Sequence, residues 1–188
     1  EPFFAALSRR IDKFKSEQVP TAGVRVNPTT AQFELLYNPK FMGALQDNHV
    51  KGVLMHEFYH LIFEHVTKRK PAEGIRLIDN IAMDLSINGI SEMIGMIPCE
   101  AIPGPVMEGS TEPVKGVLPG EGKFKHLPAN QTYEWYLEQL KKMEEEAEKN
   151  GQPSPFGEDD RFDNHDGFGE GGGSEAANDI AKERLKEA

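Results

Sequence analysis

The five residues His56-Glu57-Phe58-Tyr59-His60 constrain this chain more than any other part of its sequence. On an α-helix, positions i and i+4 lie on the same face, so both histidines can bind a single Zn²⁺ ion. Glu57 then projects beside the ion, where its carboxylate can accept a proton from a water that the metal activates. The motif therefore predicts a helix here and requires a further metal ligand from elsewhere in the chain.

Apolar residues at helical spacing surround this motif and predict one long helix over residues 46–68. The apolar members are Val50, Val53, Leu54, Phe58, Leu61, Ile62 and Phe63. Pro71 closes the segment, and Asp47 or Asn48 can cap its start. Histidines buried among such neighbours need polar partners, and a metal ion supplies one. This setting favours a zinc site over a pair of charged surface residues.

The third ligand of a catalytic zinc site must come from another segment, since such sites have three protein ligands and a water position. The metzincin pattern needs glycine and histidine where this chain has Phe63 and Val66, so that class is excluded. Asp84 is the better candidate, because it lies in a second apolar helix predicted over residues 75–90. A carboxylate among apolar side chains is costly unless it is paired or bound to a metal.

Four other polar residues near the motif have alternative explanations. Asp79 lies near the start of the second helix, where the helix dipole accounts for a carboxylate, and Glu92 lies beyond its end. His65 follows the motif by five residues, about 500° around a continuing helix, so a supporting contact or a packing role is favoured. Asn88 lies one turn after Asp84 and could orient a ligand or bind the substrate.

Several further segments combine with the motif into a pattern known from one protein family. They are Asn38-Pro39, His65, Arg69, residues 80–88 (NIAMDLSIN), residues 132–136 (TYEWY) and residues 163–166 (DNHD). The chain resembles the N-terminal putative metallopeptidase domain of the VWA-like metallopeptidases of bacteria and phages. The resemblance implies a zinc-dependent metalloendopeptidase-like hydrolase of proteins or peptides. It implies the zinc ligands His56, His60 and Asp84, with Glu57 as the general base.

Partners and latency are also implied by this resemblance. Family members often carry a C-terminal VWA-like domain and occur beside AAA-type ATPases, so such a protein is an expected partner. A non-catalytic zinc-bearing scaffold or regulatory subunit of an ATPase is the competing interpretation, and hydrolysis of a non-peptide bond is a third. His165 is either a solvated loop residue or a group that folds back to the cleft. There it would stabilise the oxyanion as a catalytic residue, or occupy the fourth zinc position.

The remaining sequence predicts an α+β, zincin-like fold, mainly helical with a short β-hairpin or small sheet beside the active-site helix. Further helices are expected over residues 3–18 and 132–149, and strands over residues 23–27 and 31–37. The second strand is either a plain structural strand or an edge that pairs with an extended substrate.

Three regions are expected along the chain. Residues 1–150 form the metallopeptidase domain, residues 151–175 a flexible acidic and glycine-rich segment, and residues 176–188 a C-terminal helix. Because the chain does not begin with methionine, it is interpreted as a fragment or a processed form.

Composition limits the partners and the compartment. The net charge is −10 and no basic stripe is present, which argues against binding to nucleic acid or anionic membranes. No apolar run approaches 18 residues, so no transmembrane helix is predicted. Cys99 is the only cysteine, so no internal disulfide can form, and it is interpreted as an ordinary thiol. The expected location is the cytoplasm of a bacterial or phage-infected cell.

Overall fold

The computed structural model describes residues 2–157, 160, 177, 179–181 and 183 of the chain. The chain divides into two compact units. The first unit consists of Glu1–Ile75 and Asp163–Ala188, and the second unit of Arg76–Phe162. Helices and a small mixed sheet make the architecture α+β, which confirms the predicted fold class. The expected boundaries at residues 150 and 175 stay predictions.

The sheet of the first unit has three strands in the order β1-β3-β2. These are β1 (Ile11–Lys15), β2 (Ala22–Val26) and β3 (Phe33–Tyr37). β2 and β3 form the predicted antiparallel hairpin, whereas β1 runs parallel to β3 on its other side. β3 is therefore the central strand, and the interpretation of residues 31–37 as a substrate-binding edge is wrong. Within the described part of the chain, β2 is the edge strand on that side.

The helix predicted over residues 3–18 is correct only for its first half. α1 (Pro2–Arg9) ends at Arg9, and β1 follows directly. Ile11 and Phe14 continue the helical spacing of the apolar residues, yet residues 11–15 pair with β3 instead. Only Ile11 of this strand is buried, and Phe14 is 48% exposed. Pairing with a strand distant in sequence thus overrides the local helical pattern.

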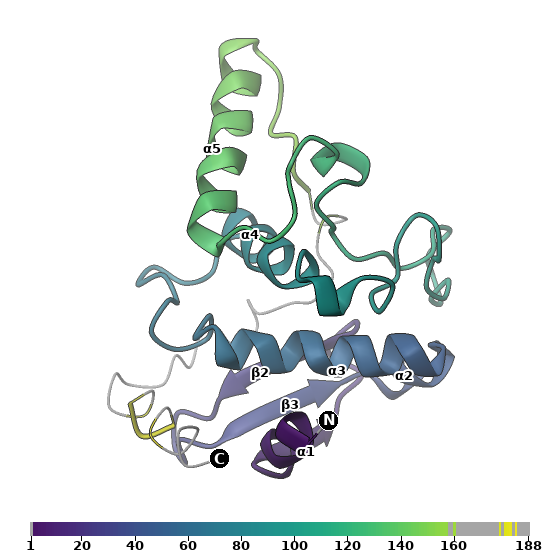
Figure 1. The fold of residues 1–188 in the computed structure, drawn as a ribbon, viewed down its shortest axis with the longest axis vertical. Helices are drawn as coiled ribbons and strands as arrows, with labels where there is room; N and C mark the ends of the chain where they lie inside the picture. The colour runs from purple at the N-terminus through teal and green to yellow at the C-terminus, as the bar shows by residue number, and fades with distance from the viewer. Residues whose placement is uncertain (1, 158–159, 161–176, 178, 182, 184–188) are drawn as a thin grey trace. The chain divides into compact units, whose positions relative to one another are not determined.

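The motif helix, α3 (Asp47–Ile62), packs against β2 and α1 (Figure 1). It follows α2 (Pro39–Ala44), whose start is capped by the Asn38 side chain, which accepts hydrogen bonds from two backbone amides. α3 ends six residues earlier than predicted, because Phe63 and Glu64 turn the chain out of the helix. The motif lies in the C-terminal half of α3 and ends two residues before the helix does.

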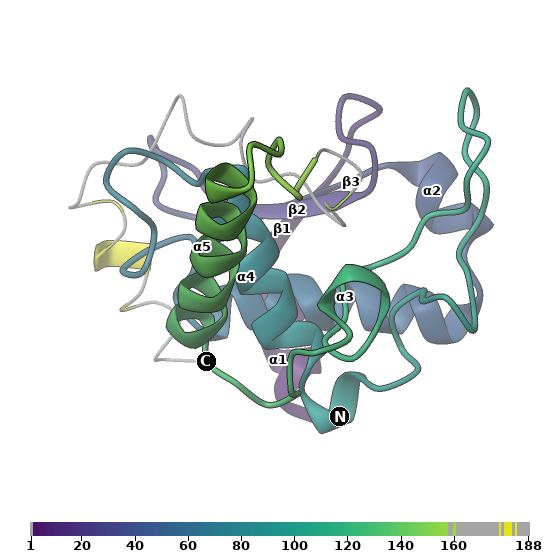
Figure 2. The ribbon, with the colours of Figure 1, turned by 90° about the horizontal axis from the view of Figure 1, so that it is seen from above.

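The second unit is built on α4 (Leu77–Asn88) and α5 (Tyr133–Lys149), which pack side by side (Figure 2). Both agree with the predicted helices to within two residues. Between them, the predicted connector over residues 91–129 contains two short 3-10 turns, η1 (Ser91–Met93) and η2 (Gly122–Phe124). The Tyr133 hydroxyl donates a hydrogen bond to Asp79 and links the starts of α4 and α5.

Candidate metal site

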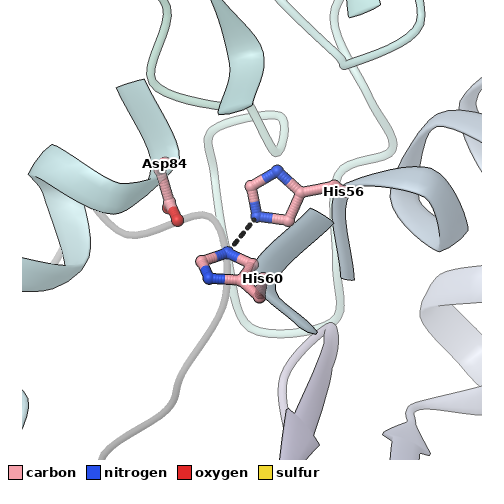
Figure 3. A group of neighbouring side chains, drawn as sticks. All are labelled: His56, His60 and Asp84. Atoms are coloured by element: carbon pink, nitrogen blue, oxygen red, sulfur yellow. Dashed lines mark hydrogen bonds between the residues drawn. The ribbon is translucent and has the colours of Figure 1, made fainter. Parts of the chain in front are cut away.

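Two imidazoles meet on one face of α3. His56 and His60 are one turn apart, both are fully buried, and their Nε2 atoms lie 3.0 Å apart (Figure 3). The i, i+4 spacing produces this approach, as the sequence predicted. Two nitrogen donors are therefore held ready by a helix that is packed against the sheet.

Asp84 lies in the middle of α4 and is also fully buried. One of its carboxylate oxygens, Oδ2, accepts a hydrogen bond from Asn80 Nδ2 at 3.4 Å, one turn earlier on the same helix. The alternative carboxylates have other roles or positions. Asp79 accepts hydrogen bonds from the backbone and guanidinium of Arg76, and Glu92 is exposed. Sequence reasoning missed Asn80, although its i, i+4 spacing to Asp84 could have identified it.

The ligand atoms of His56, His60 and Asp84 all lie within 4.8 Å of one another, so this group could hold a metal ion (Figure 3). The donor chemistry fits zinc, whose catalytic sites combine imidazole nitrogen with carboxylate oxygen and leave a position for water. Tetrahedral geometry with zinc–nitrogen distances of about 2.0–2.1 Å separates two donor atoms by about 3.3 Å. The 3.0 Å between the two Nε2 atoms needs only a small opening to reach that value.

Glu57 follows His56 on α3 and is fully buried. Its side chain leaves the helix about 100° around the axis from that histidine, so it does not share the histidines' face. A carboxylate taken out of water is costly unless its surroundings compensate it, which makes a purely accidental position unfavourable. Its catalytic role stays a prediction.

His65 lies directly against His60. Their Nδ1 atoms are 3.2 Å apart and their ring centroids 5.1 Å apart, and His65 is fully buried. The predicted rotation of about 500° from His60, which leaves His65 about 140° away from the His60 face, assumed that the helix continues past residue 65. Because α3 ends at Ile62, the chain turns back and brings the ring to the motif. The preference for a supporting contact or a packing role agrees with this position.

Comparison with known proteins adds the family. A family described as "Putative metallopeptidase domain" matches residues 1–187. The chain belongs to this family. An uncharacterized protein of Thermotoga maritima is 31% identical over 119 residues, which are 61% of this chain and 29% of that protein. The chain thus spans less than a third of this relative's length, and no solved structure matches it significantly.

Membership of the metallopeptidase domain family confirms the resemblance inferred from the motif and residues 80–88. The remaining predicted residues have separate outcomes. Asn88 donates a hydrogen bond from Nδ2 to the Val117 carbonyl at 2.9 Å, so it secures a loop of the second unit. Cys99 is a buried free thiol. His165 lies outside the described residues, and its catalytic role stays a prediction.

None of the described helices combines the length with the apolar character that crossing a bilayer requires.

Proposed function

We propose that this chain is a zinc-dependent metalloendopeptidase-like hydrolase, in which His56, His60 and Asp84 hold the metal and Glu57 is the general base. The observation that carries the proposal is the approach of the three donor atoms to within 4.8 Å. It is joined by a fully buried glutamate, Glu57, which follows His56 in the sequence of α3. Membership of the metallopeptidase domain family supports the reaction class.

The donor set and its spacing favour zinc over other metals. Two histidines and one carboxylate also form the facial triad of non-haem Fe(II) oxygenases. The pattern His-Glu-x-x-His on a helix, however, places a glutamate beside the ion, which suits hydrolysis. When bound, zinc lowers the pKa of a water and polarises the scissile carbonyl.

Glu57 performs the proton transfers in this proposal. Its carboxylate accepts a proton from the attacking water and then donates it to the amine that leaves when the peptide bond breaks. The carboxylate is fully buried, so little competing water surrounds it and its interactions are strengthened by the low local dielectric. Replacing it with an amide removes the proton acceptor and changes the shape very little.

A peptide substrate is supported by the position of β2. This strand lies at the edge of the described sheet and packs against α3. An extended peptide can add to such an edge through backbone hydrogen bonds. We therefore propose β2, rather than the central β3, as the strand that aligns the substrate.

The test compares the wild-type chain with Glu57→Gln and with Glu73→Gln, an exposed control. Each protein is assayed for bound zinc and for cleavage of a peptide library. We expect one zinc per chain in all three proteins and a loss of about 10²–10⁴-fold in cleavage rate only in Glu57→Gln.

Two outcomes would contradict the proposal in different ways. If Glu57→Gln cleaved peptides at the wild-type rate, Glu57 would not be the general base. Zinc bound by every protein with no cleavage of any peptide would instead favour the scaffold interpretation, with a partner such as an AAA-type ATPase.

A further inference from the structure

Each of the two ring nitrogens of His60 faces the imidazole of a different histidine. Its Nε2 faces His56 Nε2 at 3.0 Å, and its Nδ1 faces His65 Nδ1 at 3.2 Å. A hydrogen bond between two neutral imidazole nitrogens uses one proton and one lone pair. Three imidazoles therefore form a row in which each ring restricts the tautomer of the next.

Metal binding fixes the direction of this row. A ligating nitrogen must present its lone pair, so neither His56 Nε2 nor His60 Nε2 can keep a proton when the ion is bound. Neutral His60 must then carry its proton on Nδ1. The group opposite that proton is His65 Nδ1, which must present a lone pair.

We propose that His65 is a positioning residue, whose Nδ1 accepts a hydrogen bond from His60 Nδ1–H and so fixes His60 in the metal-binding tautomer and orientation. This inference rests on the proposed zinc ligands. Metal-bound histidines usually donate their second ring N–H to an acceptor, and loss of that acceptor weakens metal binding.

The backbone after α3 places His65 for this contact. The amide of His65 donates to the His60 carbonyl at 2.9 Å, and the amide of Glu64 donates to the Leu61 carbonyl at 3.0 Å. These two bonds form a Schellman motif, in which one residue takes the left-handed conformation. That residue is Glu64, with φ of +60°, where glycine is usual. A conformation that costs energy is thus maintained where it turns His65 back to His60.

The loop beyond the turn holds this arrangement. The Arg69 amide donates to the Glu64 carbonyl at 2.9 Å, and the Arg69 guanidinium donates to the Phe63 carbonyl at 3.4 Å. The Phe63 ring lies 5.7 Å from the His65 ring. Aromatic packing alone could explain a buried ring here, and it makes a different prediction: phenylalanine should then replace His65 without affecting the metal.

The experiment compares His65→Phe, which keeps an aromatic ring but has no acceptor, with His65→Asn, whose Oδ1 can accept near the position of Nδ1. Zinc affinity is measured by competition with a chromophoric chelator, and thermal unfolding of the metal-free proteins checks the fold. We expect about a 10–100-fold loss of affinity for His65→Phe and a much smaller loss for His65→Asn. Wild-type affinity in a folded His65→Phe protein would overturn the proposal.

A measurement on the unmodified chain covers the case in which His65→Phe does not fold. Long-range ¹H–¹⁵N spectra of the zinc-loaded protein should show His60 protonated at Nδ1 and His65 protonated at Nε2. A proton on His65 Nδ1 would overturn the proposal. If the wild-type chain binds no zinc, the ligand set itself fails and the positioning role with it. If zinc binds and the tautomers differ, only the role of His65 fails.

Discussion

Removal of zinc should lower the thermal stability of this protein by an amount that the site allows us to estimate. The proposed ligands His60 and Asp84 are 24 positions apart in the sequence, on different helices. An unfolded chain holds such donors together poorly, so the ion binds mainly to the folded state. Binding then stabilises the fold by RT ln(1 + [Zn²⁺]/Kd).

The expected size follows from this relation. Free zinc at 100 times Kd contributes about 2.7 kcal/mol. For a chain of about 150–250 residues, 1 kcal/mol changes Tm by about 2–4 °C, so the shift should be about 5–11 °C. If Asp84→Asn weakens binding about a hundredfold, the same zinc concentration contributes only about 0.4 kcal/mol. The variant should then show a shift of about 1–2 °C.

The assay is calorimetry or fluorescence-monitored unfolding of metal-free protein, with and without added zinc. His126→Ala serves as the control, because His126 is exposed and lies outside the metal group. Its shift should equal that of the wild type. A full wild-type shift in Asp84→Asn would refute Asp84 as a ligand, and no shift in the wild type at saturating zinc would refute the site.

Two further predictions concern groups away from the metal ligands. Burial lowers the pKa of His49 below its ordinary 6.5, so the unfolded chain binds the proton more readily and stability should fall as the pH drops through 6.5. Between about pH 7.5 and 5.5, the free energy of unfolding of His49→Gln should fall less than that of the wild type. Urea unfolding with a chelator present measures both values, and an equal fall in the two proteins would contradict the prediction. Tyr133→Phe removes the 3.3 Å hydrogen bond to buried Asp79 and should cost about 1–2 kcal/mol in denaturant unfolding. The control is Tyr37→Phe, because Tyr37 is half-buried. If Tyr133→Phe lowered the free energy of unfolding by no more than Tyr37→Phe does, the hydrogen bond to Asp79 would not be stabilising.

The parts of the fold that the sequence predicted well are those in which local periodicity and burial agree. Apolar patterns predicted the motif helix, α4, α5 and the β2–β3 hairpin, although the motif helix ends six residues earlier than expected. β1 does not: its residues Ile-Asp-Lys-Phe-Lys alternate poorly, and only Ile11 is buried. Its extended conformation depends on backbone bonds to β3, about 22 positions further along the chain, which no local pattern reveals.

The candidate site, like the fold, was predictable where local sequence patterns determine it and not where distant or irregular backbone does. The approach of His56 to His60 follows from helix geometry alone, and Asp84 is indicated by the cost of a carboxylate in an apolar helix. The contact of His65 with His60 was not predictable in this way, because it depends on where α3 ends. Pro71 marks a stop nine residues after the actual end at Ile62.

The missed helix end and the missed contact have one physical origin. A helix that closes through a Schellman motif normally has glycine in the left-handed position, and glycine is the signal that sequence reasoning seeks. Here Glu64 takes that conformation, so the signal is absent. Departures from local preference tend to occur at functional sites, where strain is compensated by what it positions. The strained residue at the end of α3 brings His65 Nδ1 to within 3.2 Å of His60 Nδ1, and the proposed positioning role of His65 depends on this contact.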